Sequence, residues 1–326
     1  MSTAPIITKA SEAIAEGKLV IFPTETVYGL GANALDAKAC AAIFQVKDRP
    51  HFNPLIVHIA DPAQVTTLTT WIPPKASTLM LHFWPGPLTL VLPKSELIPD
   101  IVTAGLGTVA LRIPDHAVAR VLLEASGLPI AAPSANRFQH LSPTDVDHID
   151  PLIRKQAAVV LDGGPSRVGL ESTIIGFQGD MPYCLRLGGL SLESIESVVG
   201  PLIAAPPSDV PLAPGMFVKH YSPRKPLILW NGTLSHDPSR CAFVSWQQPP
   251  NRIPFGRNER LSASGDLKEA AARLFSVLRS LDESEVECIY AELVPDIGLG
   301  RAINDRLRRA ATSEIETGLV TSALRF

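Results

Sequence analysis

Apolar runs and amphipathic segments alternate along the first part of the chain. The apolar positions in 7–14 recur at the three- to four-residue spacing of a helix face, and the apolar run 19–22 predicts a buried strand. A second helical pattern covers 36–47, with Asp36 as a suitable N-cap, and the run 55–59 predicts the next strand. The order helix, strand, helix, strand favours an α/β layer fold.

The same order continues to about residue 200. In the segment 107–113 apolar residues alternate with polar ones, as in a half-buried strand, so Thr108 and Arg112 share the face opposite the apolar set. A helix capped by Asp115 follows. Further strands are expected at 88–92, 130–132, 159–161, 173–177 and 184–187, and a last helix from Ser191 to about Gly200.

The amino-acid composition of the chain changes after residue 200. Seven prolines fall within 201–226, which resists regular structure and predicts a semi-rigid linker. Strand-like runs at 227–230, 242–246 and 289–293 and an amphipathic helix from Asp266 follow. We therefore predict an α/β domain over 1–200, a Pro-rich linker over 201–226 and a smaller α/β domain over 227–326.

Composition narrows the class of protein. Of the 326 residues 46% are hydrophobic, which supplies a well-filled core, and the net charge of −3 argues against a general nucleic-acid coat. The four cysteines are far apart and form no CxxC pair, so we expect buried free thiols. The N-terminus lacks a signal-peptide pattern, and no apolar run approaches the roughly 18 residues that span a bilayer. These features predict a soluble, cytoplasmic protein.

The stretch 23–58 has the richest candidate chemistry. Hydroxyls, a tyrosine and glycines come first, and Lys47, Arg49, Asn53 and His58 follow. The chain has no GxxxxGK[ST] motif, so any ATP site is not a P-loop. Lys47 and Arg49 can hold phosphate oxygens as a point charge and a bidentate fork, or can be a solvated pair at a helix end. Asn53 can donate amide hydrogen bonds or serve as a turn residue.

Polar residues at other strand positions extend this set. His58 lies in an apolar run, where a structural histidine and a site residue are both open. Arg112 is the stronger candidate, because a buried guanidinium needs an anion, such as a substrate carboxylate. Further polar candidates follow or occupy strand ends, namely Ser134, Ser142, Ser172 and Arg186.

Two C-terminal patterns point elsewhere. Gly298-Leu299-Gly300-Arg301 lacks the third glycine of a dinucleotide fingerprint, so we do not expect NAD binding. The arginines that follow can contact RNA or form a solvated helix face, and we favour the solvated face; they are Arg301, Arg306, Arg308 and Arg309.

Taken together, these segments resemble the threonylcarbamoyl-AMP synthase family in its two-domain form. The motifs that carry the resemblance are Pro23-Thr24-Glu25-Thr26-Val27-Tyr28-Gly29-Leu30-Gly31, Lys47-Asp48-Arg49-Pro50, Asn53-Pro54-Leu55-Ile56-Val57-His58, Pro133-Ser134-Ala135-Asn136, Glu171-Ser172-Thr173-Ile174, Ala213-Pro214-Gly215-Met216 and Lys219-His220-Tyr221-Ser222-Pro223. The resemblance implies a YrdC-like catalytic domain with a twisted open α/β sheet, and a Rossmann-like α/β domain after the linker. It also implies that L-threonine, bicarbonate and ATP give threonylcarbamoyl-AMP and pyrophosphate, for tRNA modification next to the anticodon.

The same resemblance assigns roles to residues. Lys47 and Arg49 fall at the catalytic positions. The L-threonine positions are Thr26, His58, Arg112 and Ser172, and the ATP positions are Arg49, Asn53, Thr108, Ser134, Ser142, Arg186 and Tyr221. His220 or Tyr221, on the linker, is expected to close over the nucleotide. Mg²⁺ is expected with ATP, held mainly by the phosphates and not by a protein metal site.

Some positions depart from the family pattern. Phe138-Gln139 replaces a Ser-Gly pair, Gly176 stands where aspartate is common, and Leu187 stands where proline is common. Two rival functions stay open: a double-stranded RNA-binding module, and a carbamoyl-adenylate-forming enzyme with a different amine substrate. We expect a monomer that passes its product to a tRNA threonylcarbamoyl transferase complex, and the sequence leaves direct tRNA contact open.

Overall fold

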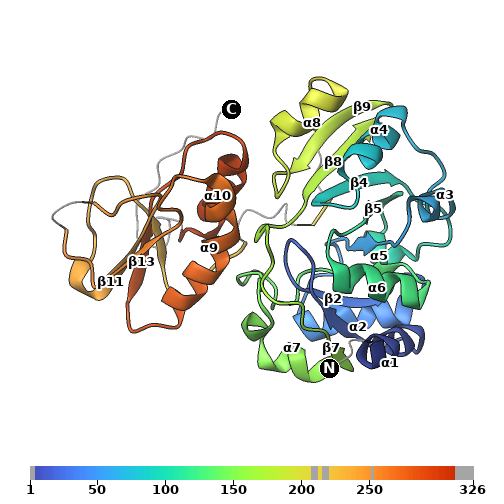
Figure 1. Cartoon of the computed structure of the whole chain (residues 1–326), viewed down its shortest axis with the longest axis horizontal. Helices are drawn as coiled ribbons and strands as arrows, with labels where there is room; N and C mark the ends of the chain where they lie inside the picture. The colour runs from blue at the N-terminus through green and yellow to red at the C-terminus, as the bar shows by residue number, and fades with distance from the viewer. Residues whose placement is uncertain (1–3, 207–211, 215–219, 251–252, 313–326) are drawn as a thin grey trace.

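Two lobes, each built around one β-sheet, make up the molecule (Figure 1). The computed structural model describes residues 4–206, 212–214, 220–250 and 253–312. In the described part of the first lobe the sheet has nine strands in the order β7-β1-β2-β6-β3-β5-β4-β8-β9. Their bounds are β1 Val20–Phe22, β2 Gly29–Asn33, β3 Ile56–His58, β4 Leu88–Pro93, β5 Thr108–Arg112, β6 Ile130–Ala131, β7 Val159–Val160, β8 Thr173–Gln178 and β9 Met181–Arg186.

Helices cover both faces of this sheet, as the apolar periodicity predicts. One face packs against α1 (Ala4–Ala15) and α6 (Ala117–Ser126) through Ile14, Phe22 and Leu122. The other face packs against a larger apolar cluster that includes residues of α2, α4 and α8. The remaining helices are α2 Ala37–Lys47, α3 Val65–Leu68, α4 Pro74–Phe83, α5 Asp100–Thr103, α7 Pro151–Gln156 and α8 Leu192–Val199, with short 3₁₀ turns at Pro62–Gln64 and Val146–His148.

Most of the elements expected in this lobe form within a residue or two of their predicted bounds. The side chain of Asp36 caps α2, as predicted. The predicted cap at Asp115 is wrong, because the side chain of His116 accepts the hydrogen bond from the backbone of Val118. Strand β2 was missed because its glycines read as a loop. A Cβ at Gly31 would lie 2.7 Å from both Phe22 and Ile130, so close packing, and not a turn, requires this glycine.

The second lobe is the expected Rossmann-like α/β unit. Its four described strands are all parallel, in the order β10-β13-β11-β12, with bounds β10 Leu227–Leu229, β11 Cys241–Ser245, β12 Arg257–Arg260 and β13 Cys288–Ala291. Helices α9 (Leu267–Asp282) and α10 (Leu299–Ala310) lie on the side of this sheet that faces the first lobe (Figure 1), and a 3₁₀ turn covers Pro238–Arg240. The edge strand β12 was missed, because its Arg-Asn-Glu-Arg sequence has no apolar pattern.

All four cysteines are free thiols, as expected. Cys241 and Cys288, 47 residues apart in sequence, are register partners on the neighbouring strands β11 and β13. No helix in the described ranges has the length and apolar character needed to cross a bilayer.

Residues of the first lobe join the apolar core of the second. Leu141, Leu170 and the linker residue Tyr221 all pack into the cluster formed by α9, α10 and the second sheet. Gly169 approaches α9 so closely that a Cβ there would lie 2.5 Å from the Cα of Ala272. The two lobes therefore share one packed surface. Of the linker, 201–206, 212–214 and 220–226 are described, and the motif residues Gly215, Met216 and Lys219 lie outside the described residues.

Candidate active site

A cavity opens at the carboxyl ends of β3 and β5, where open α/β sheets commonly place their ligands. These two strands are parallel neighbours, and their last residues, His58 and Arg112, are register partners. The linker covers the cavity with Pro214, His220 and Tyr221. Eight of the predicted site residues line it: Thr26, Arg49, His58, Arg112, Ser134, Ser172, Arg186 and Tyr221.

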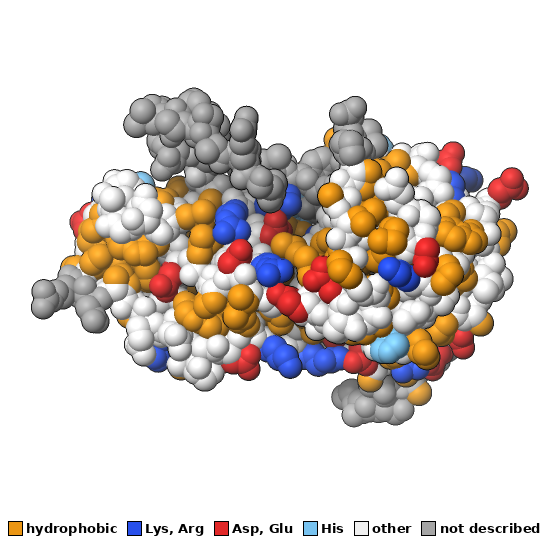
Figure 2. Space-filling model, turned by 90° about the horizontal axis from the view of Figure 1, so that it is seen from above, with side chains coloured by type: hydrophobic (Ala, Val, Ile, Leu, Met, Phe, Trp, Pro, Cys, Tyr) orange, Lys and Arg blue, Asp and Glu red, His pale blue; other side chains and the backbone are white. Residues whose placement is uncertain are grey.

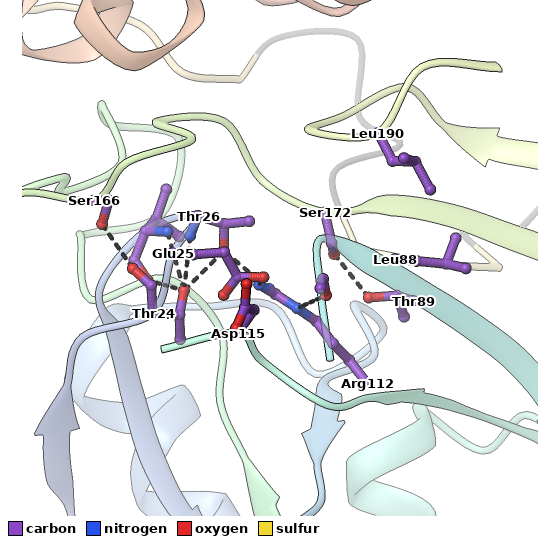
Figure 3. Close-up of polar contacts among 12 residues, drawn as sticks. Thr24, Glu25, Thr26, Leu88, Thr89, Arg112, Asp115, Ser166, Ser172 and Leu190 are labelled. Carbon is purple, nitrogen blue, oxygen red and sulfur yellow. Dashed lines mark hydrogen bonds and ion pairs between the residues drawn. The ribbon is translucent and has the colours of Figure 1, made fainter. Parts of the chain in front are cut away.

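Arg112 is buried and held from three sides (Figure 3). Its Nε donates to the carbonyl of Gly86 at 3.1 Å, Nη1 donates to Thr26 Oγ1 at 2.9 Å, and Nη2 lies 2.6 Å from Glu25 Oε1. Each Nη carries a second hydrogen, so the guanidinium of this cavity-lining residue keeps donor capacity beyond these contacts. The fixed geometry suits bidentate binding of a carboxylate.

Glu25 corrects one step of the sequence argument. The burial of Arg112 was expected to require a substrate carboxylate, yet the fully buried Glu25 already supplies the anion. Burial of Arg112 by itself therefore does not indicate an acidic ligand; its position on the cavity wall does. The sequence contained one signal for this partner, because Glu25 is the only carboxylate in the 23–31 motif.

A chain of hydroxyl hydrogen bonds fixes the orientation of Thr26. Thr24 Oγ1 donates to the carbonyl of Val27 at 2.6 Å, and the hydroxyls of Thr24 and Thr26 are 2.8 Å apart. Because Thr24 donates its only hydroxyl proton to the carbonyl of Val27, Thr26 must donate to Thr24. Thr26 then accepts from Arg112, and its remaining lone pair can accept a further N–H or O–H from a ligand in the cavity.

His58 is a neutral imidazole. Burial and the nearby charge of Arg112 lower the pKa of His58 to about 3. Its ring lies edge-on to Phe22 with 5.8 Å between centroids, and its Nδ1 has no hydrogen-bond partner among the described residues. The ring therefore offers a neutral hydrogen-bonding group beside Arg112 without adding charge.

Three cations form the other half of the site without forming an ion pair with any carboxylate in the described part of the chain. Arg49 donates from Nε to Asn53 O at 3.3 Å and from Nη2 to Pro54 O at 2.8 Å. Lys47 Nζ donates to the carbonyls of Ser134 and Asn136. Backbone carbonyls orient these groups but do not neutralise them.

Arg186 is the third cation of this half. It donates to the carbonyls of Ser172 and Pro214, and from Nη2 to Ser172 Oγ at 3.1 Å. Ser172 Oγ also lies 2.7 Å from Thr89 Oγ1, so this hydroxyl joins β4 to the start of β8 (Figure 3).

The electrostatics of this half of the site favours an anion. Burial, followed by the charge of Arg49, holds the pKa of Lys47 well below its usual value. Burial and the charge of Arg186 likewise lower the pKa of Arg49 to about 9, so it stays charged at neutral pH. Closely spaced buried cations that depress one another's pKa are stabilised when a polyanion enters.

Four predicted residues lie outside the cavity lining. Lys47 and Asn53 are immediately behind it, and the buried amide of Asn53 has neither atom paired among the described residues. Ser142 donates to Glu171 Oε1 at 2.5 Å, so it acts on the cavity through Glu171. Thr108 is the first residue of β5 and Arg112 the last, so they are roughly 13 Å apart at the usual rise of a strand. The structure does not bring Thr108 to the other site residues.

Two of the departures from the family pattern have a local explanation. A Cβ at Gly176 would lie 2.6 Å from the ring of Tyr183, so an aspartate there would require that ring to move. Leu187 packs against the apolar core of the second lobe. Phe138 lies edge-on to His220, with 5.9 Å between ring centroids, and thereby contacts the linker.

Besides Glu25, two further charged residues of the site region were missed. Glu171 lines the cavity, although its segment was chosen for its hydroxyls. Arg306 was predicted on a solvated helix face and that prediction is wrong, because its side chain is 1% exposed and pairs with Glu171 at 3.0 Å. Arg308 is exposed, as predicted for a solvated face, whereas Arg301 and Arg309 are half-buried and pair with Glu193 and Asp305. Among the described residues, no three His, Cys, Asp or Glu side chains group to hold a metal ion.

Comparison with known proteins places this site in a family. A family model described as "Telomere recombination" matches residues 12–188, and one described as "Threonylcarbamoyl-AMP synthase, C-terminal domain" matches residues 190–312. The threonylcarbamoyl-AMP synthase of Bacillus subtilis is 43% identical, over 95% of this chain and 94% of the relative. That of Pyrococcus abyssi is 42% identical, over 93% of each chain.

A solved structure agrees over both lobes. The crystal structure of P. abyssi Sua5 complexed with L-threonine superposes with a TM-score of 0.85 at 41% identity, covering 94% of each chain. Fold, domain order and full-length identity point the same way. The chain belongs to the threonylcarbamoyl-AMP synthase family, in its two-domain form.

Proposed function

We propose that the protein is an L-threonylcarbamoyladenylate synthase, which converts L-threonine, bicarbonate and ATP into threonylcarbamoyl-AMP and pyrophosphate. One observation carries the proposal. A single cavity joins a buried, carboxylate-competent arginine, Arg112, to a group of cations that form no ion pair with a carboxylate of the described chain. An amino acid and a polyphosphate are the two ligands that this division of charge suits. Full-length identity to synthases of this name supports the same reaction.

The residues suggest how each substrate is oriented. The threonine carboxylate pairs with the free N–H groups of Arg112, and Thr26 accepts a hydrogen bond from the amine or hydroxyl. His58 and Ser172 complete this half. Bicarbonate is protonated and loses water to give CO₂; the threonine amine attacks the CO₂ and releases a proton to form a carbamate. A carbamate oxygen then attacks the α-phosphorus of ATP while pyrophosphate leaves.

The cations of the other half hold the triphosphate. Arg49 and Arg186 line the cavity, and Lys47 acts from behind it through Ser134. No protein nucleophile is needed, so positioning and neutralisation of charge supply the catalysis. Asn53, Ser142 and Tyr221 support the ATP half in this proposal, whereas Thr108 would need a rearrangement to reach it.

Mg²⁺ enters this proposal as part of the substrate MgATP. Since the described residues offer no cluster of three ligating side chains, the phosphate oxygens and water would hold the ion. Its charge would offset that of the triphosphate. All the other groups that orient the substrates are side chains of this chain.

We propose that the linker moves during the reaction. With Pro214, His220 and Tyr221 over the site, the cavity has a volume of about 50 Å³, room for only a few water molecules. Threonine and ATP together need several times more. We therefore propose that these residues withdraw to admit ATP and return over the nucleotide.

The rival functions have less support. A double-stranded RNA-binding module needs a contiguous basic surface, whereas Figure 2 shows Lys and Arg side chains interspersed with Asp and Glu where the lobes meet. A different amine substrate is tested directly below. We further propose that the protein works in the cytoplasm as a monomer and passes its adenylate to a tRNA threonylcarbamoyl transferase complex.

Pyrophosphate release from ATP tests the proposed reaction. We expect release that requires both L-threonine and bicarbonate and that falls to background with either omitted. L-Serine and glycine serve as competing amines, and we expect them to support much slower release. Release that is indifferent to threonine, or equal with another amine, would refute the assignment.

A further inference from the structure

Arg306 links the second lobe to the wall of the candidate active site. It lies on α10, and its side chain is 1% exposed. Its Nε donates to Glu171 Oε2 at 3.0 Å, and its guanidinium carbon lies 4.8 Å from the centre of the Tyr221 ring. Both partners line the cavity, although Arg306 itself does not. A residue of the second lobe thus holds two residues of the site.

Glu171 is restrained from both lobes. Ser142 of the first lobe donates to its Oε1 at 2.5 Å, and Arg306 of the second lobe donates to its Oε2. A buried carboxylate with both oxygens engaged has little freedom to turn toward another cation. Arg186 is a competing cation, because it lines the same cavity as Glu171 and donates to Ser172, the residue that follows Glu171 in the chain.

Whether Glu171 pairs with Arg306 or with Arg186 determines the net charge of the half of the cavity that the triphosphate is proposed to occupy. Arg186 donates only to Ser172 and to the carbonyl of Pro214 in the described chain, and forms no ion pair there. If Arg306 were absent, Glu171 would be a buried, unpaired carboxylate, and such a group strongly favours the nearest guanidinium. Glu171 would then neutralise Arg186 and occupy the place of a substrate anion.

We propose that Arg306 is a positioning residue for ATP binding: it holds Glu171 away from Arg186, so that Arg186 stays available to the triphosphate. The inference rests on the proposed function and adds to it a role for the second lobe. According to this inference Arg306, which lies outside the cavity, affects the binding of ATP and not that of threonine.

The decisive experiment compares Arg306→Met with the double variant Arg306→Met/Glu171→Gln. For the single variant we expect the KM for ATP and the Kd for ATP from calorimetry to rise at least about tenfold, the size of a lost interaction with a charged group, with the KM for threonine within about twofold of wild type. Glutamine at position 171 cannot neutralise Arg186, so the double variant should recover ATP affinity to within about threefold of wild type.

Matched controls separate positioning from folding. Arg308→Met removes an exposed arginine from the same helix and should leave both KM values unchanged. Arg306→Lys keeps the charge and should give an intermediate ATP affinity. Thermal unfolding of each variant reports on the fold; if Arg306→Met does not fold, the comparison is made between Arg306→Lys and Arg306→Lys/Glu171→Gln.

Two results would overturn the proposal. One is an ATP affinity of the single variant within twofold of wild type. The other is a double variant that binds ATP no better than the single variant, which would mean that Arg306 acts only through packing. Wild-type protein without threonine-dependent pyrophosphate release would instead refute the proposed function, and the calorimetric ATP affinities would still test Arg306.

Discussion

Buried charges in this protein differ in whether a carboxylate accompanies them. Arg112 and Arg306 each have a buried glutamate partner, whereas Arg49 and Arg186 have backbone carbonyls. Removing one member of a buried pair leaves an uncompensated charge, which costs more than removing both. The paired arginines are therefore tied to stability, and the carbonyl-held ones to an anionic ligand.

The Glu25–Arg112 pair gives a stability prediction. Glu25→Gln leaves Arg112 charged and buried, so the free energy of unfolding should fall by about 3–5 kcal/mol. Urea unfolding followed by circular dichroism measures it. The double variant Glu25→Gln/Arg112→Met should lose less than Glu25→Gln alone, and a larger loss in the double variant would contradict the charge argument.

The same double variant tests the role of Arg112 in binding. Without the guanidinium, the threonine carboxylate loses its charged partner, so the KM for threonine should rise at least about tenfold. The KM for ATP should stay within about twofold of wild type. An unchanged threonine KM in this folded variant would remove the carboxylate role of Arg112.

His58 makes the fold sensitive to acid. Its pKa is about 3 when folded and about 6.5 when unfolded, so between these values the unfolded chain binds more protons. Stability is therefore lost as the pH falls below about 6.5. From pH 7 to pH 5, above the range where most carboxylates titrate, His58 should account for about 2 kcal/mol of the loss.

Replacing His58 isolates this contribution. Urea unfolding of His58→Gln at pH 7 and pH 5 should show a decrease smaller than that of wild type by about this amount. His82, an exposed histidine on α4, gives the matched control variant His82→Gln, whose decrease should equal that of wild type. Equal decreases in all three proteins would refute the neutral, buried state of His58.

At the scale of elements, the carboxyl end of α2 connects to the loop after β6. Lys47, the last residue of α2, reaches the carbonyls of Ser134 and Asn136 in that loop. A neutral amine has two N–H groups, one for each of these two carbonyls. In this pairing of helix and loop, burial and the charge of Arg49 lower the pKa of Lys47.

ATP binding should then be accompanied by proton uptake. A triphosphate beside Lys47 favours the ammonium form and raises its pKa back toward the usual value. Calorimetry of ATP binding near pH 8, in buffers of different ionisation enthalpy, measures the number of protons taken up. Lys47→Met should lower that number relative to wild type, and an equal uptake in both would exclude Lys47 as its source.

The sequence predicted the helices and strands in which apolar and polar side chains follow a regular pattern. Alternating or amphipathic segments such as 107–113 and 267–282 formed as expected, because one face of each meets a core. Strands β2 and β12 gave no such signal: in β2 glycine makes room for Phe22 and Ile130, and in β12 charged residues form a sheet edge. The pattern of a sequence shows which apolar groups are buried, but it does not show where two segments of backbone pack closely together.

The sequence predicted eight of the residues that line the cavity, but neither Glu171, which also lines it, nor Arg306, which pairs with Glu171. Arg112, His58 and Ser172 lie at strand ends that the apolar runs locate. Glu171 and Arg306 are 135 residues apart, and only the packing of α10 against the first lobe brings them together. An ion pair between residues far apart in the sequence produces no periodic pattern. The sequence of α10 by itself therefore predicts a solvated basic helix.

For the whole molecule, the shared core joins the second lobe to the candidate active site. Deleting 201–326 removes Arg306 and Tyr221 and exposes Leu141 and Leu170. We expect the fragment 1–200 to lose threonine-dependent pyrophosphate release and to aggregate more readily than the full chain. Release assays and light scattering on both proteins measure this, and a fully active, monodisperse fragment would contradict it.

The contact of Arg306 with Glu171 also limits how the chain can vary in evolution and engineering. A chimera that takes its second lobe from a relative would join two surfaces that had adjusted to different partners. Its activity would depend less on overall identity than on whether residues 171, 221 and 306 arrive as a compatible set. Every crossover within the linker separates residue 171 from residue 306, so lobe exchange should succeed only where the incoming residue 306 can pair with the resident residue 171.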